Sequence, residues 1–239
     1  MLAMKREKVL GIIPARYGST RFPGKPLAQI KGRSLLQRVY ENARRCPHLD
    51  KVVIATDDLR IEAHAKTFNA EVVMTSNTCA SGTDRCIEVI NQNDCFSQYE
   101  RIINLQGDEP LLEPVVIEQV IHALDEAPMS SAKKALTCEN RLRDPSVVKC
   151  VCDLNQKALL FSRALSPRGA VYEHLGIYGF RRDFLLKLQT LPPTPMQLSE
   201  DLEQLKVLEH GFSIKVPTVE SLSIGVDHPE DIREVEKHL

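Results

Sequence analysis

The feature that most constrains the fold is a short apolar run at residues 9–13, which is followed by a cationic loop. A continuous apolar run of this length is typical of a strand that is covered on both faces of its sheet, and we expect Pro14 to end it. Three cations lie in the loop that follows: Arg16, Arg21 and Lys25. A helix is expected to begin near Ser34, a residue type favoured at helix N-termini. Strand, cationic loop and helix in this order are typical of phosphate sites at the carboxyl edge of α/β sheets.

This loop fits neither of the two common phosphate-binding motifs. A Walker A motif has four residues between its first glycine and Gly-Lys, followed by a hydroxyl residue that binds magnesium. Here five residues separate Gly18 from Gly24-Lys25, and Pro26 stands in the hydroxyl position. The dinucleotide fingerprint G-x-G-x-x-G is also absent from the sequence. For any single cation an ordinary solvated loop remains the alternative, but the combination favours a polyphosphate site of another kind.

The first half of the chain alternates strand and helix patterns. Expected strands lie at 8–13, 51–55, 71–74 and 101–105. Expected helices lie at 34–45, 59–68, 83–91 and 114–125. This repetition predicts an α/β fold with a mostly parallel sheet and right-handed crossovers.

After residue 131 the pattern changes. A hairpin is expected from 147–153 and 158–161, followed by a strand at 174–180. A helix at 199–209, a strand at 212–217 and a terminal helix from Pro229 complete the prediction. At 239 residues the chain is expected to form a single domain, 1–239.

Charge is distributed unevenly along the chain. The net charge is −1, which gives no general argument for binding nucleic acid or a membrane. Residues 1–45 nevertheless hold 11 Lys and Arg against 2 Asp and Glu, whereas the remainder holds 20 against 30. The cationic segment suits a polyphosphate, and the acidic remainder can supply carboxylates to a hard metal ion.

The seven cysteines show no C-x-x-C pair and no zinc-site spacing. We expect all of them to be reduced thiols, which places the protein in the cytoplasm. The apolar run near the N-terminus is short and interrupted by Pro14, so we expect neither a signal peptide nor a membrane span.

Two acidic residues lie next to the ends of predicted elements, in positions suited to metal binding. Asp108 comes just after the fourth strand, beside Gly107, and Asp227 precedes the expected terminal helix. Each has an ordinary alternative, because Gly-Asp after a strand is often a turn and an Asp before a helix is often a cap. Taken singly, neither acid is decided by the sequence.

The run I-P-A-R-Y-G-S-T-R-F-P-G-K-P-L at residues 13–27 resembles the signature of the sugar-activating cytidylyltransferases. Further motifs of that family follow in order up to Asp231. They are S-G-T-D-R at 81–85, Q-G-D-E-P at 106–110, S-R-A at 162–164, H-L-G-I-Y-G-F at 174–180, L-E-Q-L at 202–205 and G-V-D-H-P-E-D at 225–231. Continuation of the first motif to Lys25 favours 3-deoxy-manno-octulosonate (Kdo) over sialate as the acceptor sugar.

The resemblance implies a Rossmann-like three-layer nucleotide-diphosphosugar transferase fold, with a mostly parallel sheet and an antiparallel dimerisation element. The segment 131–195 is where that element would fall, so a homodimer is expected. The implied reaction transfers CMP from CTP to the 2-hydroxyl of Kdo and serves lipopolysaccharide synthesis. Transfer to another acid sugar, such as sialate, is the alternative within the family, and a non-catalytic nucleotide-binding regulator is the alternative outside it.

The resemblance also assigns roles to individual residues. It implies that Asp108 and Asp227 bind Mg²⁺. It implies that Arg16 and Lys25 bind the triphosphate of CTP, assisted by Arg21. It gives the base or ribose to Ser81, Gly82 and Arg85, although a plain capped helix start is the alternative for this segment. It gives the acceptor sugar to Gln106, Arg163, His174, Tyr178, Glu203 and Gln204. Glu230 and Asp231 are expected to serve the helix dipole, and the role of Glu109 stays open.

One departure from the family pattern concerns the acceptor region. The segment between Ala164 and His174 is short, and Ser166-Pro167 replaces the usual Ile-Pro. The resemblance therefore constrains the reaction class more tightly than the details of acceptor recognition and dimer contact.

Overall fold

The computed structural model describes residues 6–18, 22–92, 94–164, 171–222 and 224–239. The chain divides into two compact units. The first contains residues 1–117 and 222–239, and the second contains residues 118–221. The helix α4 (Pro114–Ala123) includes the point at which the chain passes from the first unit into the second.

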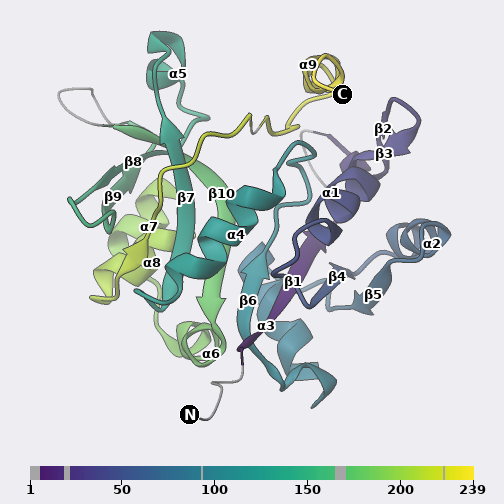
Figure 1. The fold of residues 1–239 in the computed structure, drawn as a ribbon, viewed down its shortest axis with the longest axis horizontal. Coiled ribbons are helices and arrows are strands. Elements are labelled where there is room, and N and C mark those ends of the chain that lie inside the picture. The colour runs from purple at the N-terminus through teal and green to yellow at the C-terminus, as the bar shows by residue number, and fades with distance from the viewer. Residues whose placement is uncertain (1–5, 19–21, 93, 165–170, 223) are drawn as a thin grey trace. The chain divides into compact units, whose positions relative to one another are not determined.

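The first unit is built on four parallel strands in the order β6–β1–β4–β5 (Figure 1). Their bounds are β1 Lys8–Ala15, β4 Lys51–Thr56, β5 Glu71–Met74 and β6 Tyr99–Asn104. The crossover helices are α1 Leu35–Arg44, α2 Leu59–Thr67 and α3 Gly82–Gln92. Right-handed crossovers place α1 and α2 on one face and α3 on the other, because the connection from β5 to β6 runs back across the sheet. The four strands and three helices expected for this region are confirmed.

The strand β1 differs from expectation at its end, since it continues through Pro14 to Ala15. Pairing of β1 with β6 stops at Ile12, whose carbonyl oxygen accepts from the N–H of Leu105 at 2.8 Å. The backbone groups of alternate residues in a strand point toward the same neighbouring strand, so an N–H at position 14 would point toward β6, as that of Ile12 does. Pairing with β6 has already ended at Ile12, so the proline costs no hydrogen bond there. The expectation that Pro14 ends the strand is therefore wrong, because the proline removes no ladder hydrogen bond.

Helix α1 begins where the sequence predicted. Ser34 adopts an extended conformation and its hydroxyl accepts from the N–H of Gln37 at 3.0 Å. The helix then buries an apolar stripe against the sheet. The buried residues are Leu35, Leu36, Val39, Tyr40 and Ala43.

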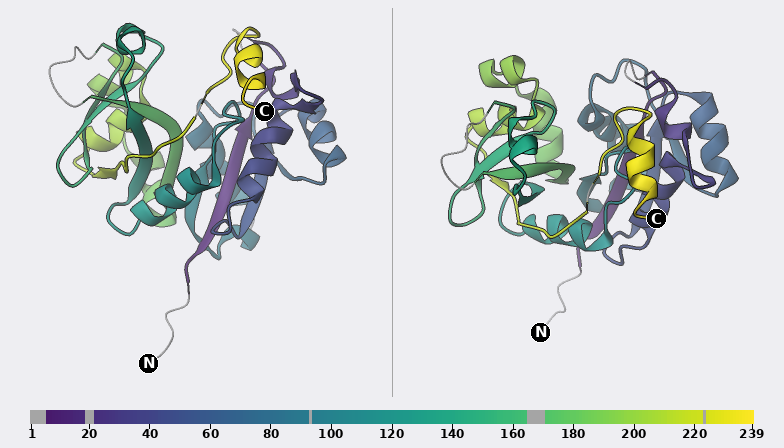
Figure 2. Two further views of the ribbon diagram at one scale, coloured as in Figure 1. Left: turned by 45° about the horizontal axis from the view of Figure 1, so that its top comes forward. Right: turned by 90° about the horizontal axis from the view of Figure 1, so that it is seen from above.

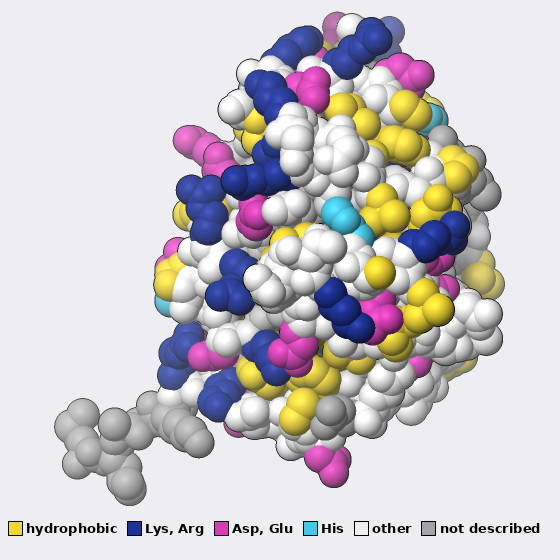
Figure 3. Space-filling model, turned by 90° about the vertical axis from the view of Figure 1, so that its right-hand side faces the viewer, with side chains coloured by type: hydrophobic (Ala, Val, Ile, Leu, Met, Phe, Trp, Pro, Cys, Tyr) yellow, Lys and Arg dark blue, Asp and Glu magenta, His cyan; other side chains and the backbone are white. Residues whose placement is uncertain are grey.

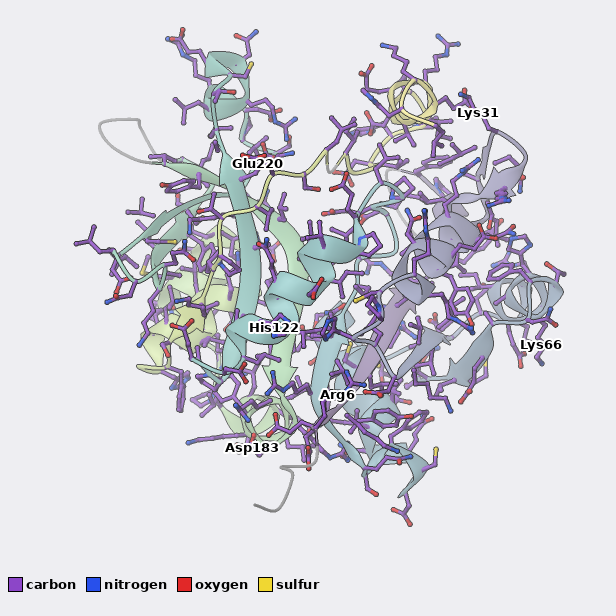
Figure 4. The ribbon with its side chains drawn as sticks, viewed as in Figure 1. Arg6, Lys31, Lys66, His122, Asp183 and Glu220 are labelled. Carbon is purple, nitrogen blue, oxygen red and sulfur yellow. The ribbon has the colours of Figure 1, made fainter. Side chains whose placement is uncertain are left out.

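The C-terminal helix α9 (Asp231–Glu236) belongs to the first unit and lies beside a small hairpin (Figures 1 and 2). The hairpin strands are β2 Gln29–Ile30 and β3 Arg33–Ser34, and Lys31 at its turn is labelled in Figure 4. The backbone N–H of Lys31 donates to Glu236 Oε1 at 3.1 Å. A fully buried cluster joins these elements through Ile30, Leu35, Val226 and Val235. The last residues of the chain are thus anchored to its first quarter. Two short 3-10 helices, Lys25–Leu27 and Asp94–Phe96, complete this unit.

The second unit contains antiparallel strands. Strand β7 pairs with β10 antiparallel and with β11 parallel, and β8 pairs with both β10 and β9. The strands are β7 Met129–Ala135, β8 Lys149–Cys152, β9 Ala158–Ser162, β10 Tyr172–Arg181 and β11 Ile214–Lys215. The helices are α5 Glu139–Arg143, α6 Arg182–Thr190, α7 Pro195–Glu200 and α8 Glu203–Glu209. The expected hairpin (β8–β9) and the expected strand (β10) are confirmed.

Three features of the second unit and the C-terminus differ from expectation. The single helix expected at 199–209 is two helices, because Asp201 adopts a left-handed conformation with φ 53° and so ends α7. The buried strand β7 was missed because it carries Lys133, whose Nζ donates to the carbonyl oxygen of Val216. The terminal helix begins at Asp231 and not at Pro229.

Much of the charge on the first unit is paired at the surface. Figure 3 shows one face on which basic and acidic side chains are interspersed. The pairs include Lys66–Glu62 on α2, Lys51–Glu71 between β4 and β5, and Arg33–Glu41, at 2.6, 2.7 and 2.5 Å. Exposed pairs of this kind contribute little to stability, typically below about 1 kcal/mol each. Within residues 1–45, Arg33 is paired with Glu41 and Arg6 with Asp50, so the cations of this segment are only partly available to a ligand.

All seven cysteines are free thiols, as expected. Within the residues that the structure describes, no helix combines the length and apolar character needed to cross a bilayer.

Candidate functional site

Lys25 brings together the two acids that the sequence singled out. Its ammonium nitrogen lies 2.8 Å from Asp108 Oδ2 and 3.6 Å from Asp227 Oδ1, and it also donates to the carbonyl oxygen of Val226 at 2.8 Å. The Lys25 side chain is only 15% exposed. Gly24 makes this placement possible, because its φ of 71° turns the chain just before the lysine. Residues 119 positions apart in sequence, Asp108 and Asp227, therefore face one cation.

Two local arrangements hold the acids in place. The N–H of Val226 donates to the carbonyl oxygen of Asp108 at 2.9 Å, which ties the two acidic segments to each other. The carboxylate of Asp231 accepts from the N–H groups of Asp227 and His228, both at 2.8 Å. The expected role of Asp231 at the helix start thus takes a specific form, since its carboxylate braces the loop that carries Asp227.

This donor set fits a hard divalent cation. Asp108, Asp227 and the carbonyl oxygen of Val226 are all oxygen ligands, which Mg²⁺ prefers. Both carboxylates are partly exposed, at 31% and 44%, so an ion could keep several of its waters, as Mg²⁺ usually does. A cation already lies between the two carboxylates in the form of the Lys25 ammonium, so the local charge balance favours positive charge there.

The loop that carries Lys25 is closed on itself by Tyr17. The N–H of Gly24 donates to the carbonyl oxygen of Tyr17 at 3.0 Å. The guanidinium carbon of Arg60 lies 3.3 Å from the centroid of the Tyr17 ring, a close cation–π contact. A methyl group at Gly24 would lie 3.2 Å from the same ring, which adds a second reason for glycine. Tyr17 was part of the quoted motif, but no role was assigned to it from sequence. Arg21 lies outside the described residues.

A pocket of about 150 Å³ lies in the first unit, past the end of β1. Five of the residues predicted to contact nucleotide or sugar line it: Arg16, Ser81, Gly82, Arg85 and Gln106. Pro14 and Cys79 also contribute to its lining. The sequence therefore predicted residues that the fold does bring to one cavity.

The start of α3 forms one wall of this pocket. Ser81 Oγ accepts from the N–H of Asp84, and Asp84 Oδ2 accepts from the N–H of Ser81, both at 3.0 Å. This reciprocal pair is a capping box, so the capped helix start considered from sequence is present. A Cβ at Gly82 would meet Asn104 Nδ2 at 3.3 Å, and the glycine thus permits close packing of α3 on β6. The cap and the nucleotide contact do not exclude each other, because the pocket lies against the same turn.

Arg85 is more buried than its predicted role suggested. The residue is 4% exposed, its Nη1 donates to Thr75 Oγ1, and its Nη2 lies 3.4 Å from Asp57 Oδ1. Part of its guanidinium thus braces the interior beneath the pocket. Burial and a hydrogen bond to Glu88 raise the pKa of the Cys79 thiol to about 11, so this pocket-lining cysteine is protonated at neutral pH.

In the second unit, three of the predicted acceptor residues form one buried cluster. His174 Nε2 lies 2.8 Å from Ser131 Oγ, and the His174 ring lies 5.5 Å from the Tyr178 ring. The Tyr178 hydroxyl donates to Gln204 Oε1 at 3.2 Å. Gln204 is 1% exposed, and among the described residues its buried Nε2 has no hydrogen-bond partner. Glu203 precedes it in the first turn of α8 and is only partly buried.

His174 gives the protein a pH-dependent stability that can be measured. Burial lowers the pKa of His174 to about 3 from its ordinary 6.5. Below about pH 6.5 the unfolded chain therefore binds a proton that the folded chain refuses, so the free energy of unfolding falls as the pH drops from about 6.5 toward 3.

We expect the free energy of unfolding to fall more steeply with decreasing pH in the wild type than in His174→Gln, by up to about 1.4 kcal/mol per pH unit. Urea unfolding of both proteins at several pH values between 7 and 4 measures the difference. Parallel curves for the two proteins would show that His174 is protonated equally in both states.

Arg163 lies at the end of β9, apart from the hydrogen bonds of that cluster. Its Nη1 donates to the carbonyl oxygens of Pro145 and Ser146, at 3.3 and 3.1 Å. Strands β9 and β10, which carry Arg163 and His174, follow each other in the sequence, but β8 lies between them in the sheet. In the described part of the chain the acceptors of its guanidinium are backbone carbonyls, and none is a carboxylate.

Comparison with known proteins gives consistent matches along the chain. A family model described as cytidylyltransferase matches residues 10–215. A 3-deoxy-manno-octulosonate cytidylyltransferase of Protochlamydia amoebophila is 50% identical, covering 97% of this chain and 94% of that protein. A mitochondrial protein of the same name from Arabidopsis thaliana is 45% identical, covering 97% of this chain and 83% of its own.

Solved structures agree with these sequence matches. A CMP:2-keto-3-deoxy-manno-octonic acid synthetase complexed with CTP superimposes with a TM-score of 0.90 at 36% identity, covering 97% of this chain and 98% of its own. A 4-diphosphocytidyl-2C-methyl-D-erythritol synthase from Anaerococcus prevotii superimposes with a TM-score of 0.67 at 14% identity, covering 97% and 98%, and shares the fold alone. The expected mostly parallel α/β fold with an antiparallel element is confirmed.

Proposed function

This chain belongs to the cytidylyltransferases, and from that membership we propose that it transfers CMP from CTP to the 2-hydroxyl of Kdo. The products are CMP-Kdo and pyrophosphate, and CMP-Kdo serves lipopolysaccharide synthesis. The observation that carries the proposal is the convergence of Lys25, Asp108 and Asp227 on one point. The names of relatives at 45–50% identity over nearly the whole chain support Kdo as the acceptor.

The residues of the first unit suit nucleotidyl transfer. Attack on the α-phosphate of CTP builds negative charge on phosphoryl oxygens and on the departing pyrophosphate, so positioned cations supply most of the catalysis. Lys25 and Arg16 bind the triphosphate and stabilise that charge. Asp108 and Asp227 would hold Mg²⁺, and the bound ion would supply positive charge at the α-phosphate and at the sugar hydroxyl. Because CTP also offers anionic oxygens, the Lys25 ammonium can exchange a carboxylate for a phosphate without losing its charge partner.

The substrates divide between the residues described above. The pocket beside α3 takes the nucleotide, with Ser81, Gly82 and Arg85 near the base or ribose. Gln106 lines that pocket as well, and the family resemblance assigns it to the acceptor sugar. The acceptor sugar is bound by the remaining predicted residues: Arg163, His174, Tyr178, Glu203 and Gln204. His174 acts there as a neutral hydrogen-bonding group, because burial lowers its pKa far below neutrality.

A product assay tests the proposal. The purified protein is incubated with CTP and Mg²⁺, together with Kdo, sialate or a third 2-keto sugar acid, and pyrophosphate and the nucleotide sugar are quantified. We expect CMP-Kdo as the main product. Activity with sialate and not with Kdo would mean that sialate is the acceptor, which is the alternative within the family. No pyrophosphate with any acid would favour a nucleotide-binding regulator.

We further propose that the protein is a cytoplasmic homodimer. Seven free thiols are typical of a reducing compartment. In the described part of the chain β9 pairs only with β8, which leaves one edge of β9 open. Leu159 on β9 is 62% exposed, and Leu154 in the hairpin turn is fully exposed. An open edge carrying apolar side chains suits a second copy of the same segment.

The dimer proposal predicts a definite mass in solution. Light scattering at micromolar concentration should give the mass of two chains, and Leu159→Lys should shift the population toward one chain, because it places a charge on the open strand. Leu59→Lys is a matched control, since Leu59 is 72% exposed on α2 in the first unit. A monomeric wild-type protein with full activity would contradict the proposal.

A further inference from the structure

The backbone of Arg163 is held from both sides by charged groups. Its N–H donates to Glu200 Oε2 at 3.1 Å, and its carbonyl oxygen accepts from Lys149 Nζ at 2.7 Å. Lys149 is fully buried, at 0% exposure, and Glu200 is the last residue of α7. Charge-assisted hydrogen bonds are stronger than neutral ones, and two of them on one residue fix its position at the end of β9.

The guanidinium of Arg163 is oriented by the same buried lysine. Lys149 Nζ also donates to the carbonyl oxygen of Asp144 at 2.5 Å. That residue opens the turn whose next two carbonyls, of Pro145 and Ser146, accept from Arg163 Nη1. One ammonium group thus joins the backbone of the arginine to the turn that holds its side chain.

This arrangement leaves one edge of the guanidinium available. In the described part of the chain, hydrogen bonds of the guanidinium are recorded only from Nη1, so Nε and Nη2 have no acceptor there. The Nε and Nη2 donors lie side by side, and such an edge binds a carboxylate through two parallel hydrogen bonds. The geometry therefore suits an acid ligand that approaches from the edge opposite the turn.

We propose that Glu200 and Lys149 are positioning residues, which hold Arg163 so that its Nε–Nη2 edge receives the carboxylate of the acceptor sugar. The inference rests on the proposed function and deepens it. It gives a role to the Glu200 carboxylate and the buried Lys149 ammonium, which bond to the backbone of Arg163 and are not themselves assigned to a substrate. Ser162 strengthens the arrangement, since its hydroxyl donates to the same Glu200 carboxylate at 3.1 and 3.2 Å. Supporting hydrogen bonds of this kind keep a binding residue in the geometry that its ligand requires.

The test uses Glu200→Gln, which keeps the shape of the side chain and removes its charge. We expect the KM for Kdo to rise up to about 10-fold, because the hydrogen bond to the Arg163 N–H loses its charge assistance. The KM for CTP and kcat should stay within about twofold, because the nucleotide residues lie in the first unit. Lys149 is too deeply buried for its variant to separate a folding defect from a binding defect, so Glu200 carries the test.

Glu209→Gln is the matched control. The Glu209 carboxylate accepts from the N–H groups of Met196 and Gln197, at the other end of α7. Its loss should loosen the same helix and lower the melting temperature without changing either KM. If Glu200→Gln behaves in the same way, with a lower melting temperature and an unchanged KM for Kdo, Glu200 is merely structural and the inference is overturned.

A double-mutant cycle shows whether Glu200 acts through Arg163. Arg163→Ala should itself raise the KM for Kdo, and adding Glu200→Gln to it should change that KM by less than about twofold, because the positioned group is gone. A further 10-fold rise would mean that Glu200 acts independently, which overturns the inference. An Arg163→Ala variant with a normal KM for Kdo would overturn it as well.

Failure of the proposed function gives a different result. If wild-type protein uses another 2-keto sugar acid in place of Kdo, the Kdo proposal fails, and the same variants are measured with that acid, since the inference concerns its carboxylate. If wild-type protein releases no pyrophosphate with any such acid, both the proposed function and the positioning role are overturned.

Discussion

Replacing Lys25 by alanine should lower turnover about 10²–10³-fold, the usual loss when a charge-stabilising donor is removed from an active site. The Lys25 ammonium reaches both Asp108 and Asp227, and its side chain is largely shielded from water. The variant therefore loses a cation for the triphosphate and leaves two carboxylates facing each other. Pyrophosphate release under saturating substrates measures the effect.

A control separates charge in general from this particular charge. Lys66→Ala removes an equally cationic side chain from α2 (Figure 4). Lys66 is 64% exposed and paired with Glu62. That variant should turn over like the wild type. Loss of a shielded cation from between two carboxylates should also lower the melting temperature of Lys25→Ala, so turnover is compared at a temperature at which both proteins are folded. Near-normal turnover of Lys25→Ala would remove the lysine from the catalytic machinery.

Asp108→Asn and Asp227→Asn should each reduce Mg²⁺-dependent turnover about 10²-fold or more. A bound metal ion contributes several kcal/mol of charge stabilisation, and each decade of rate corresponds to about 1.4 kcal/mol. Because the two carboxylates share one site, the double variant should be scarcely worse than either single variant, since residues that act as a unit are not additive.

Mg²⁺ titration of the rate and calorimetry of Mn²⁺ binding measure these effects separately. Asp94→Asn is a suitable control, since Asp94 is exposed in a 3-10 helix of the same unit. We expect Mn²⁺ to bind to the control as to the wild type and to lose affinity in both site variants. Unchanged Mn²⁺ affinity in either site variant would exclude that aspartate from the metal site.

Local pattern was sufficient for the parallel part of the fold. The run at 71–74 became β5 with the same bounds, and Ser34 caps α1 as expected. In the second unit, buried polar residues concealed a strand from the same pattern. Strand β7 was not predicted because it contains the buried Lys133, whose ammonium group donates to the carbonyl oxygen of Val216. Asp201 broke an expected helix because its left-handed conformation cannot be inferred from periodicity.

The motifs named residues that the fold brings near one another, but they did not show how those residues are arranged. The motifs identified Asp108 and Asp227, yet only the fold shows that Lys25 lies between them. Arg85 was expected to face a ligand, but part of its guanidinium binds Thr75 in the interior. The positions of Arg163 and His174 depended on strand order, and consecutive strands in the sequence were not neighbours in the sheet. Long-range pairing is information that a single sequence does not display.

The return of residues 222–239 to the first unit fixes the order in which the protein can become functional during its synthesis. The ribosome produces Lys25 and Asp108 early, but Asp227 emerges only after the whole of the second unit. Val226 and Val235 must then pack against Ile30 and Leu35, because these four residues form one buried cluster that is incomplete until the C-terminal segment has been made. A nascent chain therefore holds an incomplete cation site throughout most of translation. A fragment that ends before Asp227 lacks one of the two carboxylates that face Lys25.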